Sequence, residues 1–205
     1  MIEIVRAGGW LMLPIILCAI VAMGIVLERI WTLQATRVVP DDLTARVWGW
    51  VKNNELTTKQ IQTLHSGSPL GQILAAALAH RNFERSLMKE SIEDTGRHVI
   101  HELERYVETL GTIAAISPLL GLLGTVVGMV KVFAEITTQG VGDPSNLAGG
   151  ISEALITTAA GLTVAIPALI GYRYLRNRID TLVVQMEKES IKLVEAIHRR
   201  NASQG

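Results

Sequence analysis

The stretch Ser117–Gly128, which reads SPLLGLLGTVVG, decides the fold that we predict for this chain. It lies inside the uncharged run Thr109–Val130, which is long enough to cross a bilayer core of roughly 30 Å as a helix. Small residues recur every three or four positions on one face of that helix, namely Gly111, Ala114, Pro118, Gly121, Thr125 and Gly128. Because small residues let helix backbones approach closely in lipid, this run predicts an interior, packed span.

Two further uncharged runs complete a set of three predicted spans. Trp10–Leu27 is rich in Leu, Ile, Val and Met, which favours a peripheral helix that faces lipid. No small-x-small site precedes Glu28, so we expect this run to stay as an anchor and not to be a cleaved signal peptide. The third run, Ala154–Tyr172, has its own line of small residues, formed by Ala154, Thr158, Gly161, Ala165 and Ala168. The expected fold class is an all-α membrane protein with three transmembrane helices.

Composition excludes several functions. The 205 residues have a formal net charge of zero, which gives no reason to expect nucleic acid as a partner. The single cysteine, Cys18, lies in the first span and is expected to be an apolar filler. Five scattered histidines and the lack of a phosphate-binding glycine loop indicate neither a metal site nor an enzyme, and we expect no cofactor.

The positions of Lys and Arg predict the orientation in the membrane. Ten of the nineteen basic residues lie within 28–108 and seven follow Tyr172, whereas Arg6 and Lys131 stand alone in the other two segments. Since basic loops stay in the cytoplasm, the N-terminus is expected outside and the C-terminus inside. The predicted regions are 1–29 with the first span, a cytoplasmic helical region 30–108, the second and third spans within 109–172 with a periplasmic loop 131–152, and a cytoplasmic helical tail 173–205.

The second and third spans are expected to continue into the cytoplasm as long helical rods. No proline interrupts the helical pattern before Pro118, so one helix is predicted from about Ser86 to Ala134. The third span continues as a heptad seam of Ile179, Val183, Met186, Ser190, Leu193 and Ile197, which suits packing within the subunit, between subunits, or both. Short helices are expected across 40–69, with boundaries at residues 40–42 and 66–69.

Polar and proline residues inside the spans are the candidate functional residues. Glu153 is either interfacial or carried into the membrane at the start of the third span, where a charge normally faces a cavity or a partner. Thr125 and Thr158 are expected at a similar depth, roughly 7 to 9 Å below the outer boundary, where they could line a wet passage with Glu153. Helical periodicity alone, however, pairs Glu153 with Thr157.

Pro118 and Pro167 each release a backbone carbonyl inside a span. Such a carbonyl is tolerated where neighbouring groups or water satisfy it. Each proline therefore predicts either a simple kink or a wall of a water-lined cavity.

The same stretches resemble a known family. Residues 117–128 resemble the second-span motif of the ExbB/TolQ proteins, and GISEAL at 150–155, followed by Thr158 and AIPA at 165–168, is similar to their third span. The resemblance covers the whole chain, but it is strong over 110–172 and weak over 36–80. The flagellar stator subunit MotA is a more distant relative with more spans.

The resemblance implies an inner-membrane proton channel that belongs to a motor complex. Five copies would surround a central pore lined by the second and third spans, which holds a single-span ExbD/TolR-like partner, and a TonB/TolA-like protein would transmit force to the outer membrane. Glu153, Thr125 and Thr158 would be the polar pore residues, and Gly121, Gly124, Gly128, Gly161 and Ala165 would pack the helices. Both an ExbB-like and a TolQ-like interpretation remain open, as does the alternative of a non-conducting scaffold that recruits cytoplasmic partners.

Overall fold

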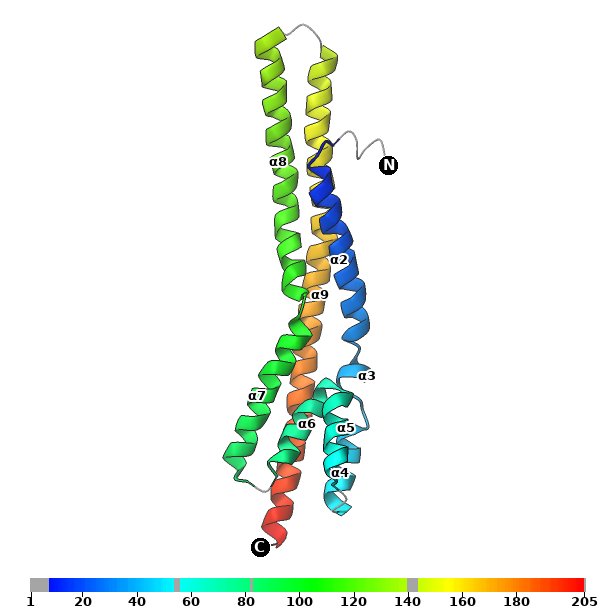
Figure 1. Ribbon diagram of the computed structural model, residues 1–205, viewed down its shortest axis with the longest axis vertical. Helices are drawn as coiled ribbons and strands as arrows, with labels where there is room; N and C mark the ends of the chain where they lie inside the picture. Colours follow the sequence, from blue (N-terminus) through cyan, green and yellow to red (C-terminus); the bar gives the residue numbers. More distant parts are fainter. Residues whose placement is uncertain (1–7, 54–55, 82, 140–143, 205) are drawn as a thin grey trace. The chain divides into compact units, whose positions relative to one another are not determined.

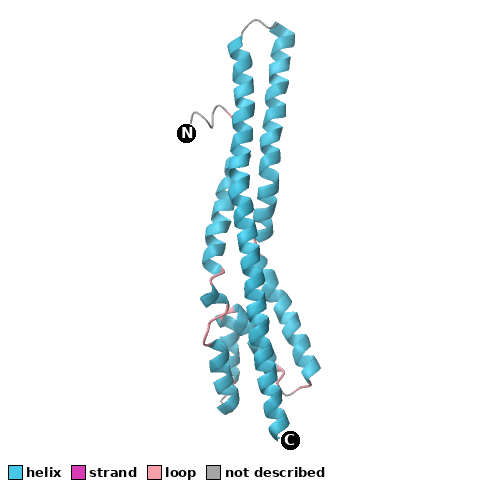
Figure 2. Ribbon diagram, turned by 180° about the vertical axis from the view of Figure 1, so that it is seen from behind, coloured by secondary structure: helices cyan, strands magenta, loops and turns pink. Residues whose placement is uncertain are grey.

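A computed structural model describes residues 8–53, 56–81, 83–139 and 144–204 of the chain. Every regular element among these residues is a helix, which confirms the predicted all-α class (Figure 2). In chain order the helices are α2 (Met12–Thr32), α3 (Ala35–Val38), α4 (Leu43–Asn53), α5 (Thr58–Gly67), α6 (Pro69–Ala79), α7 (Arg85–Glu104), α8 (Val107–Gln139) and α9 (Pro144–Gln204). Among the described residues, three helices are long and apolar enough to cross a membrane: α2, α8 and α9. Helices α8 and α9 contain the second and third predicted spans, and α2 contains the first span from Met12 onward.

The chain packs into two units, each formed by segments that are distant in the sequence. One unit comprises the residues up to Glu28 together with Tyr106–Tyr174, and the other comprises Arg29–Arg105 with the residues from Leu175 onward. Helices α2 and α9, labelled in Figure 1, therefore each contribute residues to both units.

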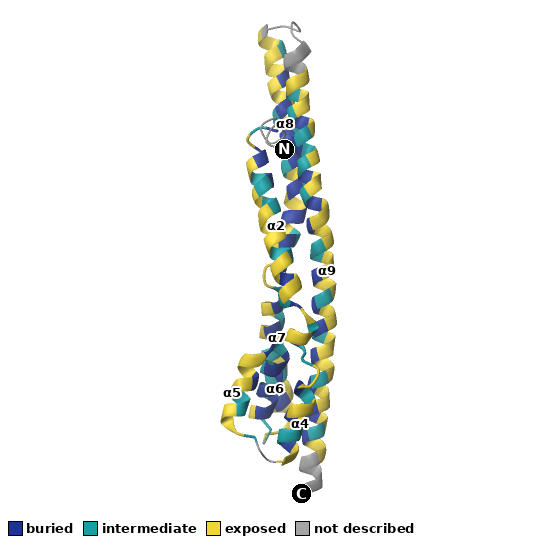
Figure 3. Ribbon diagram, turned by 90° about the vertical axis from the view of Figure 1, so that its right-hand side faces the viewer, coloured by how far each residue is buried: buried dark blue, intermediate teal, exposed yellow. Residues whose placement is uncertain are grey.

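In the first unit, α2 buries a single face. Met12, Ile15 and Ala22 are buried, whereas Leu13 and Ile20 on other faces are 70% and 65% exposed (Figure 3). A helix that is apolar on all sides and packs on only one is suited to contact lipid with the rest. This arrangement agrees with a peripheral first span.

The prediction of one helix from Ser86 to Ala134 is wrong. Helix α7 ends at Glu104, and α8 begins at Val107. Between them Tyr106 adopts a φ of 65°, in the left-handed region that a non-glycine residue rarely enters and that cannot continue a helix.

A distant arginine explains how α7 can end without a glycine or a proline. Arg29 donates from Nη1 to the carbonyl oxygens of Glu102 and Leu103, at 3.4 Å in each case. The last carbonyl oxygens of a helix lack the N–H partner that the next turn would supply. The helix dipole also favours a cation at that end. The break therefore depends on a residue more than 70 positions away, which local sequence patterns do not reveal.

The predicted long rod after the third span is confirmed, because α9 is a single helix of 61 residues. Its heptad seam is buried within one copy of the chain: Ile179, Met186 and Leu193 are each at most 2% exposed, and Ser190 is buried with them. The seam therefore packs on helices of its own subunit.

The segment between the second and third spans is mostly helical. Helix α8 extends eight residues beyond Lys131 to Gln139, and α9 starts at Pro144, nine residues before Glu153. Residues 140–143 of the predicted 131–152 loop lie outside the described residues. Both α8 and α9 continue as α-helices through Pro118 and Pro167.

Short helices occupy the region 35–79, as expected for 40–69. The predicted boundary at 66–69 is the junction of α5 and α6, where Ser68 caps α6 by accepting a hydrogen bond from the Gly71 amide at 3.0 Å. Pro69 follows in the first turn, where its missing N–H costs nothing. Helix α6 supplies the core of the second unit and contacts α3, α5 and α7.

Candidate functional site

The backbones of α8 and α9 meet at glycines in the middle of the first unit. A Cβ atom placed on Gly161 would lie 2.5 Å from the Ser117 carbonyl oxygen and 3.0 Å from the Gly121 Cα. A Cβ on Gly121 would in turn lie 3.0 Å from the Thr158 Cα. Only glycine permits such an approach, so these residues set the register of the antiparallel pair.

The small residues closer to the C-terminal end of α8 continue this contact. A side chain on Gly124 would overlap that of Thr157, and a Cβ on Gly128 would lie 2.8 Å from the Ala154 Cβ. On the other side of the crossing, Ala165 and Ala168 are buried. Glycine and alanine positions from both lines of small residues therefore lie at the contact between α8 and α9.

Thr158 joins the two helices by a hydrogen bond. Its hydroxyl donates to the Gly121 carbonyl oxygen at 2.8 Å, and the side chain is partly exposed. Thr125 is also partly exposed, but its hydroxyl donates within α8 to the Leu122 carbonyl oxygen at 2.6 Å. The two acceptors are consecutive carbonyl groups of α8, about 1.5 Å apart along its axis. The two hydroxyls therefore lie at similar depth, as the sequence predicted.

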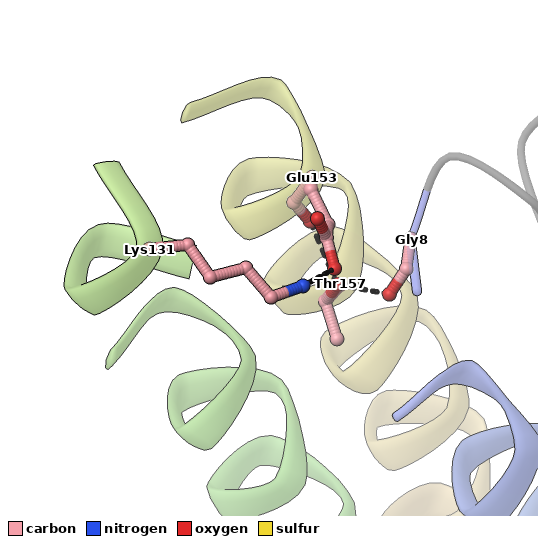
Figure 4. Close-up of polar contacts among 4 residues, drawn as sticks. All are labelled: Gly8, Lys131, Glu153 and Thr157. Atoms are coloured by element: carbon pink, nitrogen blue, oxygen red, sulfur yellow. Dashed lines mark hydrogen bonds and ion pairs between the residues drawn. The ribbon is translucent and has the colours of Figure 1, made fainter. Parts of the chain in front are cut away.

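Glu153 forms an ion pair with Lys131. The Lys131 Nζ lies 2.8 Å from Oε1 of Glu153, which joins the C-terminal part of α8 to the N-terminal part of α9 (Figure 4). The side chains are 49% and 25% exposed, respectively. A carboxylate in a membrane protein normally has such a partner, because an isolated charge costs free energy there.

Thr157 belongs to the same cluster and is 1% exposed. Its hydroxyl lies 2.7 Å from the Glu153 carbonyl oxygen and 3.0 Å from that of Gly8, in the turn that leads into α2 (Figure 4). The Thr157 hydroxyl is consequently enclosed by protein and is not presented to the surface of the subunit.

The predicted polar residues thus fall into two groups. Glu153 lies with Lys131 and Thr157, whereas Thr158 lies with Gly121. Helix geometry accounts for the division, because Glu153 and Thr158 are five residues apart and therefore point about 140° apart around α9. The association of Glu153 with Thr157 is the one that periodicity favoured, whereas the resemblance named Thr158.

Lys131 and Gly8 are members of this cluster that sequence reasoning did not assign. Lys131 entered only as the boundary of the second span and as an isolated basic residue in the orientation argument, and Gly8 has no side chain that would suggest a role. One signal was available: in an antiparallel pair, the boundary charges Lys131 and Glu153 fall at the same end and have opposite signs. Among the described residues, no group of three or more His, Cys, Asp and Glu side chains is placed to hold a metal ion.

The described part of the chain has three helices of membrane-spanning length, which define a multi-pass membrane protein. Two of these helices pack through glycines and carry the polar residues of the candidate site. Residues 65–188 match the MotA/TolQ/ExbB proton channel family. The chain belongs to this family, and it is a multi-pass protein of the inner membrane.

Individual relatives agree with this assignment. An ExbB-like biopolymer transport protein of Synechocystis sp. is 37% identical over 176 residues, which cover 82% of this chain and 67% of the relative. The biopolymer transport protein exbB1 of Vibrio cholerae is 37% identical over 115 residues, or 56% of this chain and 50% of the relative. The Tol-Pal system protein TolQ of Haemophilus influenzae is 41% identical over 83 residues, which are 40% of this chain and 36% of that protein. The chain thus spans only about half of the Vibrio relative's length.

Proposed function

We propose that this chain is the channel-forming subunit of an inner-membrane motor driven by proton flow, of the ExbB/TolQ type. The observation that carries the proposal is the placement of Glu153, Thr125 and Thr158 in or next to the uncharged spans of a glycine-packed helix pair. Ionisable and hydroxyl groups are expensive in a membrane, and they mark ion pathways when they occur there. Membership of a proton channel family supports the same conclusion.

In this proposal, Thr158 and Thr125 line the proton path, and Glu153 controls access from the outer side. Partial exposure of both threonines supports this assignment, since their side chains are available to a neighbouring helix. Thr157 supports the structure instead, because its hydroxyl is buried inside the subunit. The N-terminus faces the periplasm and the C-terminus the cytoplasm, as the distribution of Lys and Arg favours.

The motor requires other chains. The complex consists of a homopentamer around a single-span ExbD/TolR-like partner, with a TonB/TolA-like protein as force transmitter. Large apolar side chains that remain exposed in the first unit support such an assembly, since other subunits or lipid must cover them; those on α8 and α9 include Leu119, Leu122, Val126, Val130, Leu155, Leu162, Ile166 and Ile170. A proton that crosses with the membrane potential releases about 2.3 kcal/mol per 100 mV, which is the available drive.

Replacement of Glu153 tests the proposal. In a strain that lacks the native gene, we expect Glu153→Ala to fail to restore the wild-type phenotype, although the complex still assembles and co-purifies with its single-span partner. The matched control is Gly24→Ala, because a Cβ on Gly24 meets nothing within 4 Å. Full restoration of the wild-type phenotype by Glu153→Ala would show that Glu153 is not part of the proton path.

A further inference from the structure

The turn before the first span contacts the acidic residue of the third span. We propose that Gly9 and Lys131 are positioning residues that hold the Glu153 carboxylate in place at the outer end of the ion path. The inference rests on the proposed function, because it assigns these two residues to the same site. It makes the segment that leads into α2 part of that site.

The Glu153 carboxylate lies between an ammonium group and a glycine. Lys131 pairs with Oε1 at 2.8 Å, and a Cβ placed on Gly9 would overlap this same oxygen atom. An ion pair as exposed as this one holds a carboxylate only weakly by itself. The Gly9 backbone supplies the second restraint, because it lies close against the same oxygen atom.

Gly9 is suited to this position by its conformation as well as its size. Its φ of +69° lies in the left-handed region, where glycine is stable and a side chain is strained. Its carbonyl oxygen accepts a hydrogen bond from the Met12 amide at 3.2 Å, which begins the first turn of α2. The turn is therefore continuous with a membrane-spanning helix.

Two contacts of Gly8 fix the turn against α9. The buried Thr157 hydroxyl lies 3.0 Å from the Gly8 carbonyl oxygen (Figure 4). A Cβ on Gly8 would lie 2.5 Å from the Met12 Cγ and 3.4 Å from the Ile156 Cγ2, so the backbone is packed with no room for a side chain. Residues from three distant parts of the sequence thus meet at one carboxylate.

The arrangement also controls charge at the outer end. With Glu153 held against Lys131, the two opposite charges cancel and a cation meets a neutral pair. When the carboxylate moves away, Lys131 is left as an uncompensated positive charge that repels an incoming cation. Displacement of Glu153 by a side chain at position 9 is consequently expected to impair function without removing the carboxyl group.

Chemical labelling of Glu153 tests the positioning directly. The complex, purified with its single-span partner, is treated with dicyclohexylcarbodiimide, and modification of the peptide that contains Glu153 is followed by mass spectrometry. Loss of one exposed ion pair corresponds to about a fivefold change, so we expect Gly9→Ala and Lys131→Met each to speed labelling about fivefold. Lys131→Arg keeps the positive charge and is expected to label at the wild-type rate, as is the control Gly24→Ala.

The outcomes separate this inference from the proposed function. Wild-type labelling rates in both Gly9→Ala and Lys131→Met would overturn the positioning role, even if Glu153→Ala is inactive in cells. Equal acceleration by Lys131→Met and Lys131→Arg would overturn it too, because the effect would then not depend on charge. If Gly9→Ala does not assemble, the comparison of the two Lys131 variants decides the matter alone.

Discussion

Adjacent threonines in α9 have different surroundings. Thr157 is buried between the Gly8 and Glu153 carbonyl oxygens, whereas the partly exposed Thr158 donates to Gly121 on α8. A difference of one residue turns the side chain by about 100°, which moves the hydroxyl from the carbonyl oxygens of Gly8 and Glu153 to that of Gly121 on α8. The chemistry of the side chain is the same, so position alone separates the two roles.

Valine substitutions at these positions should therefore have distinct effects. Thr157→Val removes the hydroxyl that holds the turn, so we expect faster carbodiimide labelling of Glu153. Thr158→Val removes a hydrogen bond between helices, worth about 0.6 kcal/mol, and should lower proton flux while labelling stays at the wild-type rate. Labelling by mass spectrometry, combined with flux measured in vesicles, checks both. The opposite assignment of the two effects would show that Thr157 lines the path.

Sequence reasoning at this scale identified residue types but not all of their partners. The charge of Glu153 inside an apolar region and the motif around it were sufficient to select that residue. The contact with Gly8 depends on how separated segments pack, and no local pattern carries that information. The partner Lys131 could have been inferred, because its charge is opposite to that of Glu153 and lies at the same end of the helix pair. Helical periodicity did associate Glu153 with Thr157, as the structure does.

At the scale of elements, α9 and the break before α8 differ in how predictable they were. Helix α9 could be predicted because an apolar span passes into a regular heptad seam without a helix-breaking signal in between. The end of α7 could not, because no glycine or proline lies at the break. Its causes are the contact of Arg29 with the last carbonyl oxygens and the left-handed conformation of Tyr106.

Substitution at Tyr106 tests the break. Glycine accepts a positive φ freely, so Tyr106→Gly should retain the fold, whereas the β-branched Tyr106→Val should be less stable than the glycine variant by about 1–2 kcal/mol. The measurement is thermal unfolding of the complex in detergent, with the same two changes at the exposed helical residue Tyr174 as controls. At position 174 the order should reverse, because glycine is poor inside a helix. Equal stability of the two Tyr106 variants would contradict a left-handed residue there.

At the scale of the whole molecule, three spans and family membership are firm properties of the chain. The spans follow from composition and length, because a bilayer demands about 20 apolar residues for each helix. A role in a motor requires more than the spans and the family membership, since it depends on other chains that pack against the exposed apolar faces of α8 and α9. A sequence shows that such faces exist, but the partner's own residues determine what covers them.

Proton flux is the most direct test of a conducting subunit. The complex of this chain with its single-span partner is reconstituted in vesicles, a membrane potential is imposed, and proton entry is followed with an internal pH-sensitive dye. We predict a flux that depends on the potential for the wild type and for Gly24→Ala, and its loss in the double variant Thr125→Val/Thr158→Val. An undiminished flux in that double variant, or no flux above that of empty vesicles in the wild type, would contradict the account and favour a membrane scaffold.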